Sequence, residues 1–128
     1  MSVTMPLRSV ALVALLATAA CSAPGDSDAA MANALGGDPA RGHDMMRRYG
    51  CAACHMIPGV AGANGLVGPS LAGIANRAYI GGRLPNAPEN MRRWIENPRA
   101  VDPMTAMPNV GVTPQDARHI TAYLYTLR

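Results

Sequence analysis

Cys51-Ala52-Ala53-Cys54-His55 is the stretch that decides how this chain folds. Two thiols three positions apart, followed directly by an imidazole, are the signature of covalent c-type haem attachment. Each thiol can add to one vinyl group of the haem, and the short turn between the thiols matches the distance between the two vinyl groups. His55 then lies beneath the macrocycle, where a ring nitrogen can bind the iron. The motif therefore predicts one covalently bound haem c (heme c) as cofactor.

Two other interpretations of the motif are a redox dithiol and half of a zinc site. A zinc site needs two more Cys or His ligands at a suitable spacing, and the remaining histidines, His43 and His119, have no such partners. A thioredoxin-like dithiol needs a βαβ context, which the sequence lacks.

The chain has 128 residues with no Phe and one Trp. A domain this small usually needs stabilisation beyond that of its apolar core, and packing against a large flat cofactor supplies it.

Charge gives no sign of a nucleic-acid partner. The formal net charge is +3, and every basic side chain apart from the histidines is Arg. The arginines form neither a basic run nor a stripe interleaved with aromatic residues, so nucleic-acid binding is not expected.

Residues 1–20 have the pattern of a secretory signal peptide. Arg8 gives a short positive region, and the stretch from Val10 to Ala20 is apolar and uncharged. This stretch is shorter than the ~20 apolar residues that a membrane span needs. The alternative, a buried core helix, fits less well with the small residues at its end.

Cys21 is predicted to carry a lipid. Thr18-Ala19-Ala20-Cys21 resembles a bacterial lipoprotein cleavage site, and Cys21 is the one cysteine outside the haem motif. The protein would then be exported and held at the periplasmic side of a membrane, with Ser22 favouring the outer membrane of a Gram-negative host. A soluble periplasmic protein is the alternative, produced by an ordinary secretory cut after Ala19, Ala20 or Ala23.

Residues 21–37 are rich in Ala, Gly, Asp and Ser and lack apolar periodicity. This composition predicts a flexible tether between the anchor and a folded domain at residues 38–128, although a disordered leader fits equally well.

The folded domain begins and ends with well-marked helices. Asp38 is suited to cap the N-terminus of the first helix, Pro39 suits its first position, and Gly50 marks its end. Thr113 followed by Pro114 marks the start of the last helix in the same way.

Two helical segments are expected between these helices. One is a short segment at residues 70–77. The other begins near residues 86–88 and ends at Asn97, because Pro98 disfavours a helical conformation in the preceding residue. Met91, Trp94 and Ile95 form its core face. No stretch of the sequence indicates a β-strand, so the sequence predicts an all-α domain whose long loops fold over a cofactor.

A second axial ligand to the iron is expected from Pro103-Met104-Thr105-Ala106-Met107-Pro108. The occupant of this position decides between electron transfer and ligand chemistry. The stretch is too rich in Pro to be helical, and an extended loop can present a thioether across the haem plane. The residues alone leave both methionines as candidates.

Over residues 38–128 the chain resembles the class I cytochromes c. The attachment motif, Gly68-Pro69-Ser70-Leu71-Ala72-Gly73 and Thr105-Ala106-Met107 carry the resemblance. It implies the class I cytochrome c fold, with three to five helices and long loops wrapped around one covalently attached haem. It also implies that His55 and Met107 are the two metal ligands.

The resemblance assigns three further residues to the haem site. The carbonyl of Pro69 accepts a hydrogen bond from the proximal His, Arg77 lies near a haem propionate, and Trp94 lies close to the haem and the ligand Met. Gly42 and Tyr123 sit where the first and last helices cross. The stretch between Arg77 and Pro98 is shorter than in the mitochondrial proteins and lacks their propionate-bonding Trp, so one haem edge is expected to be more open.

The resemblance implies a non-enzymatic carrier of single electrons between membrane-associated respiratory complexes. Its redox partners would be a quinol–cytochrome c reductase, a cytochrome c oxidase or a dehydrogenase. One alternative is a haem-bearing subunit fixed in a membrane oxidase or dehydrogenase complex. Another is a ligand-binding haem sensor with an open sixth position.

Overall fold

The computed structural model describes residues 35–128. The predicted signal peptide at residues 1–20, the predicted lipid site Cys21 and the tether up to residue 34 lie outside the described residues. Among residues 35–128, no helix is long and apolar enough to cross a membrane.

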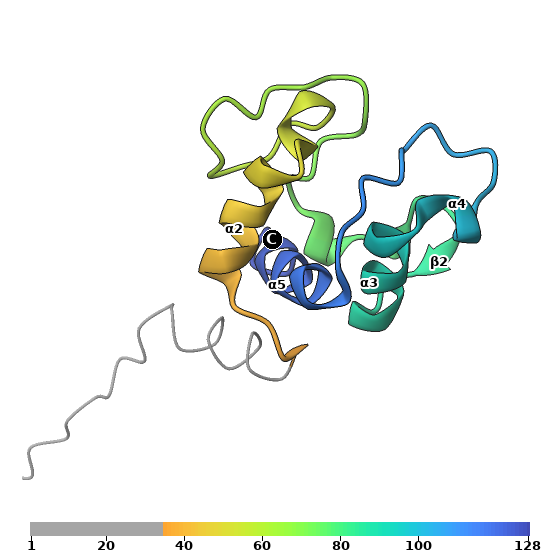
Figure 1. Cartoon of the computed structure of the whole chain (residues 1–128). Coiled ribbons are helices and arrows are strands. Elements are labelled where there is room, and N and C mark those ends of the chain that lie inside the picture. Colours follow the sequence, from red (N-terminus) through yellow and green to blue (C-terminus); the bar gives the residue numbers. More distant parts are fainter. Residues whose placement is uncertain (1–34) are drawn as a thin grey trace, which may run out of the picture.

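Helices dominate the described chain. Its elements in order are α2 (Pro39–Arg48), the 3₁₀ turns η1 (Cys51–Ala53) and η2 (Ile74–Asn76), β1 (Tyr79–Ile80), β2 (Leu84–Pro85), α3 (Pro88–Glu96), α4 (Pro98–Val101) and α5 (Pro114–Leu124). In Figure 1, α5 lies between α2 and the loop that follows it on one side and α3 and α4 on the other. The predicted arrangement of helices joined by long loops is confirmed.

The start of α2 follows from its capping residues. The Asp38 carboxylate accepts hydrogen bonds from the backbone N–H groups of Ala40 (2.9 Å) and Arg41 (3.3 Å), and Pro39 opens the helix. Gly50, with φ of 72°, turns the chain out of the helix into η1. The haem motif therefore begins directly at the end of a well-capped helix, as predicted.

Helices α2 and α5 cross at Gly42. A Cβ atom added at Gly42 would overlap the carbonyl oxygen of His119 and lie 2.8 Å from the Cβ of Tyr123. The absence of a side chain at this position lets the two backbones approach closely. The predicted crossing of the first and last helices at Gly42 and Tyr123 is confirmed.

A polar contact reinforces this crossing. The Thr113 hydroxyl oxygen accepts from the Asp116 N–H (3.1 Å), which is the predicted cap of α5. The Asp116 carboxylate in turn accepts from the Tyr49 hydroxyl (2.6 Å) and the Thr113 hydroxyl (2.9 Å). These two hydrogen bonds lower the pKa of Asp116, and the one from Tyr49 has the larger effect. The carboxylate thus ties the end of α2 to the start of α5.

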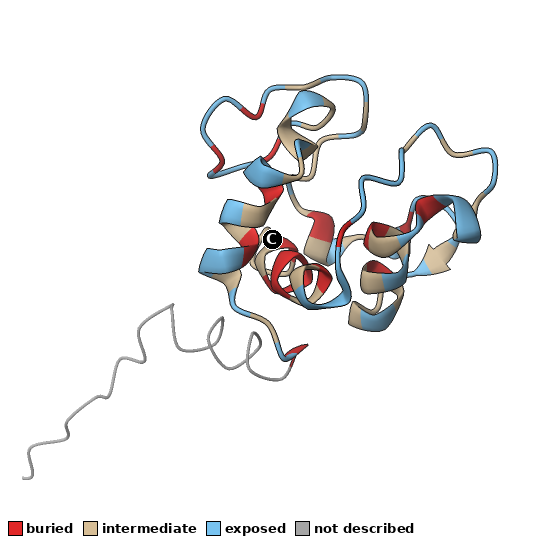
Figure 2. Ribbon diagram, viewed as in Figure 1, coloured by how far each residue is buried: buried red, intermediate tan, exposed pale blue. Residues whose placement is uncertain are grey.

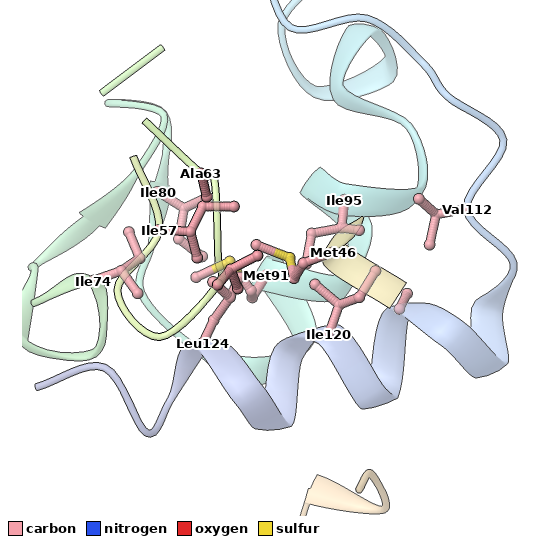
Figure 3. Close-up of a cluster of buried hydrophobic side chains, with 12 residues drawn as sticks. Met46, Ile57, Ala63, Ile74, Ile80, Met91, Ile95, Val112, Ile120 and Leu124 are labelled. Carbon is pink, nitrogen blue, oxygen red and sulfur yellow. The ribbon is translucent and has the colours of Figure 1, made fainter. Parts of the chain in front are cut away.

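The apolar core gathers around α5 (Figures 2 and 3). Ile120 and Leu124 of α5 meet Met46 of α2 and Met91 of α3, and each of these side chains is at most 4% exposed. Met91 and Ile95 form the buried face predicted for α3, with Trp94 partly buried beside them.

Two local predictions between residues 70 and 85 were wrong. The expected helical segment 70–77 forms only the 3₁₀ turn η2, because Gly73 takes a left-handed conformation (φ 66°) and Arg77 is extended. The expectation of no strands missed the hairpin in which β1 pairs antiparallel with β2. Strands of two residues are too short to show an alternating pattern.

The last residues assigned to the tether lie against α5. A Cβ atom at Gly37 would overlap the carbonyl oxygen of Arg118 and lie 3.0 Å from the Cβ of Ala122. The packed part of the chain therefore starts slightly before Asp38.

We predict that Gly42→Ala lowers the free energy of unfolding by about 1–3 kcal/mol, because the added methyl group forces the two helix backbones apart. Urea denaturation followed by circular dichroism measures the change. Arg47→Ala, at an exposed position of the same helix, should change stability by less than about 0.5 kcal/mol. Equal stability of the two variants would contradict the close crossing.

Candidate haem site

A cavity of about 420 Å³ lies in the middle of the described domain. Its lining is mainly apolar and is drawn from α2, the two 3₁₀ turns, the hairpin, α3, α5 and the loop after α4. All seven residues that the sequence assigned to a haem site line this one cavity: Cys51, Cys54, His55, Pro69, Arg77, Trp94 and Met107.

His55 is held in one orientation. Its Nδ1 lies 2.7 Å from the carbonyl oxygen of Pro69. A carbonyl oxygen can only accept, so Nδ1 carries the proton and Nε2 keeps a lone pair. Gly68 makes room for the ring, since a Cβ atom there would overlap Cε1 and lie 2.7 Å from Nδ1. The ring is therefore presented with Nε2 ready to bind a metal.

The two thiols stand on a tight turn at the cavity wall. The N–H groups of Cys54 (3.2 Å) and His55 (3.0 Å) both donate to the carbonyl of Cys51, and Gly68 N–H donates to the carbonyl of Cys54 (2.8 Å). Both cysteines are half-buried. Burial raises the pKa of the Cys51 thiol. These hydrogen bonds hold the backbone that carries the two thiols and the imidazole.

The two methionines of the ligand loop, residues 102–112, differ in position. Met107 lines the cavity, whereas Met104 is 87% exposed. The loop contains no helix or strand, as predicted. The backbone N–H of Met107 donates to the hydroxyl oxygen of Thr105 (3.2 Å). Of the two candidates, only Met107 is placed to face a group bound in the cavity.

Arg77 lines the cavity, but its guanidinium is engaged by the protein backbone. It donates to the carbonyl oxygens of Ser70 and Ala72, the latter at 3.1 Å. These carbonyls belong to the turn that follows Pro69. Arg77 therefore holds the segment that orients His55, a role the resemblance did not assign to it.

Asn86 is a supporting residue that the sequence analysis missed. Its amide donates to the carbonyl oxygens of Ile74 and Arg77, each at 2.8 Å, and its side-chain oxygen accepts from the Tyr125 hydroxyl (2.7 Å). Asn86 thereby fixes the turn around η2 to the end of α5. No local sequence pattern marks such a residue, because its partners lie 9 to 39 positions away.

Trp94 also lines the cavity, and its ring packs against Gly81 of the hairpin turn, where a Cβ atom would lie 2.6 Å from the ring. His43 and His119 are not among the residues that line the cavity. His119 is buried and its Nδ1 accepts from the Asp38 N–H (2.9 Å), which is a structural role.

The donor set fits a haem. An imidazole, a thioether and two thiols surround an apolar cavity, and these are ligand and attachment groups of c-type haem. Within residues 35–128, no three His, Cys, Asp or Glu side chains are grouped as ligands for a bare metal ion.

This fold and site define a haem-binding electron-transfer domain. The model of the cytochrome c family matches residues 39–128, so the chain belongs to the cytochrome c family. The predicted class I cytochrome c fold and the predicted cofactor, one covalently attached haem c, are confirmed with it, as is a role in electron transfer.

One curated relative is cytochrome c oxidase subunit 2 of Alkalihalophilus pseudofirmus. It is 28% identical over 89 residues, which are 69% of this chain and 25% of that protein. The chain thus spans about a quarter of the length of this relative.

We predict that Gly68→Ala tilts the His55 ring and weakens its hydrogen bond to Pro69, because the methyl group would occupy the space of the imidazole. The holoprotein should show altered electron paramagnetic resonance g-values and lose about 1–3 kcal/mol of stability. Leu66→Ala, at a neighbouring position that is 82% exposed, should change neither. A spectrum for Gly68→Ala identical to wild type would show that the contact does not hold the ring.

Proposed function

We propose that this protein is a monohaem carrier of single electrons between membrane-associated respiratory complexes, with His55 and Met107 as the axial ligands. The observation that supports this most directly is that both side chains line one cavity, while Met104 points into solvent. With His55 and Met107 both holding the iron, no substrate would have access to the metal. This arrangement suits transfer of electrons and not bond chemistry.

The chain's own residues set the properties of this site. The bound haem supplies a one-electron ferric/ferrous couple. The Pro69 carbonyl strengthens His55 as a donor, the thioether of Met107 favours the ferrous state, and the apolar lining disfavours the extra charge of the ferric state. Cys51 and Cys54 hold the group in place covalently. Packing of Trp94 and α3 against the cavity restrains movement on a change of oxidation state.

For its redox partners we propose a quinol–cytochrome c reductase, a cytochrome c oxidase or a dehydrogenase. The similarity to a segment of an oxidase subunit 2 supports an oxidase in particular. The same similarity favours a second candidate function, a haem-bearing subunit fixed in a membrane oxidase complex. Purification from membranes separates the two: a carrier leaves the complex in salt and mild detergent, and a subunit remains with it.

We also propose that the protein is exported and anchored by a lipid at Cys21. The support is the signal-like segment at residues 1–20 and the match of residues 18–21 to a lipoprotein cleavage site. An anchor of this kind keeps a carrier close to membrane-bound partners while it moves between them.

The ligand assignment predicts different outcomes for the two methionines of the loop. Met107→Ala should abolish the weak absorption band that a methionine–iron bond gives ferric haem at the red end of the visible spectrum. It should also lower the reduction potential and allow carbon monoxide to bind the ferrous protein.

Met104→Ala is the matched control, because it lies in the same loop and should change none of these properties. Loss of the band in Met104→Ala alone would transfer the ligand role to Met104. Absence of the band in the wild-type protein would contradict methionine ligation, and carbon monoxide binding by wild type would favour the haem sensor.

If Cys21 carries a lipid, the wild-type protein should partition into detergent, while Cys21→Ala should be released to the aqueous phase or fail to mature. Stable anchoring requires more than one acyl chain, so mass spectrometry should find several chains on the mature N-terminus. Equal aqueous partitioning of wild type and Cys21→Ala would identify residues 1–20 as a plain secretory signal.

A further inference from the structure

The ligand loop has few attachments along its length. Of the residues from 103 to 111, none is buried, and the loop contributes only Val112 to the apolar core. The side chain of Met107 must nevertheless face the cavity for the proposed ligation. Apart from its contacts along the cavity wall, the loop is tied to the rest of the domain chiefly by Val112 and by polar contacts at its start.

A short series of hydrogen bonds leads from Asp102 to Met107. One carboxylate oxygen of Asp102 accepts from the N–H of Met104 (3.0 Å), and the backbone carbonyl of Asp102 accepts from the N–H of Thr105 (3.0 Å). The hydroxyl oxygen of Thr105 then accepts from the N–H of Met107 (3.2 Å). The direction in which the chain leaves Asp102 therefore sets the backbone orientation at Met107.

Asp102 is itself fixed to a distant part of the chain. Its second carboxylate oxygen accepts from Arg83 Nε at 3.0 Å, across 19 positions of sequence. Arg83 lies in the turn between β1 and β2, where its N–H donates to the carbonyl of Ile80 (3.0 Å). Ile80 is 3% exposed, so the turn is anchored in the core. The series thus connects Met107 to a hairpin that is attached to the core through Ile80.

This ion pair differs from the other Arg–carboxylate pairs in residues 35–128. The pair joins two separate segments, and its Asp102 side chain is 14% exposed while its Arg83 side chain is 58% exposed. Arg92 and Glu89 are 3.9 Å apart within one helix, and Glu89 is 82% exposed. Surface pairs of that second kind contribute little. The Met104 N–H and then Arg83 lower the pKa of Asp102, so its carboxylate is ionised at neutral pH.

We propose that Arg83 and Asp102 are positioning residues for Met107: they fasten the start of the ligand loop to the β1–β2 hairpin and so keep Met107 turned toward the cavity. This inference rests on the proposed ligand role of Met107. Neither residue touches the cavity, since both are absent from its lining, so they act through the loop backbone.

The test uses full-length holoprotein carrying Arg83→Gln or Asp102→Asn. The readout is the rate at which imidazole replaces Met107 on ferric haem, followed by loss of the red absorption band. Both variants should exchange roughly threefold to tenfold faster than wild type, because each loosens the loop. The double variant should be no faster than the faster single variant, since both changes break the same contact.

The design separates positioning from charge. Arg83→Gln and Asp102→Asn change the local charge in opposite directions, so a purely electrostatic effect on the haem would move the two rates in opposite directions. Glu89→Gln, at a side chain that is 82% exposed, and Arg41→Gln, at one that is 71% exposed, impose the same charge changes at surface pairs and should leave the rate within about twofold of wild type.

A second readout is hydrogen exchange at the backbone amides of Met104 and Met107. Exchange at both amides should be faster in Arg83→Gln and in Asp102→Asn, and this local readout still applies if either variant is slightly destabilised elsewhere. Rates and exchange equal to those of the Glu89→Gln control, or changes of opposite sign in the two variants, would overturn the inference. A wild-type protein without the red band would instead overturn the ligand role of Met107, so the two failures are distinguishable.

Discussion

The hydrogen bond between His55 Nδ1 and the carbonyl of Pro69 is the contact on which the haem site depends. It decides which imidazole nitrogen carries the proton and hence which one can bind iron. A backbone carbonyl holds a fixed direction only if its turn is fixed. Arg77 binds the carbonyls of that turn, Asn86 binds the carbonyl of Arg77, and Tyr125 binds Asn86. The orientation of His55 is therefore supported from the end of the last helix.

The two sides of the cavity are restrained very differently. The side that carries His55 is held by a network of backbone and side-chain hydrogen bonds and by the close packing of Gly68 on the imidazole. The side that carries Met107 is an exposed loop, supported by Asp102 at its start and Val112 at its end. A thioether is also a weaker ligand for ferric iron than an imidazole. With Met107 as the proposed second ligand, changes in ligation are thus expected on its side of the cavity, where fewer polar contacts oppose them.

Sequence reasoning predicted the features of this protein that are encoded locally. Caps and prolines gave the starts of α2 and α5, and the spacing of the thiols and imidazole gave the attachment site, because neighbouring residues determine each of these. The hairpin was missed because two-residue strands leave no periodic pattern. The roles of Asn86, Arg83 and Asp102 were missed because their partners lie far away along the chain. The cavity contact of Arg77 was anticipated, but its engagement with the backbone was not.

The cavity and the apolar core are one structure. Met46, Met91, Ile95, Ile120 and Leu124 belong to the buried cluster and also line the cavity. The protein has no Phe to fill such a space, and protein interiors tolerate few voids larger than a water molecule. The haem therefore completes the core as well as supplying the redox couple. Because the same contacts stabilise the fold and confine the cofactor, a packing change in this cluster must alter both stability and the environment of the iron.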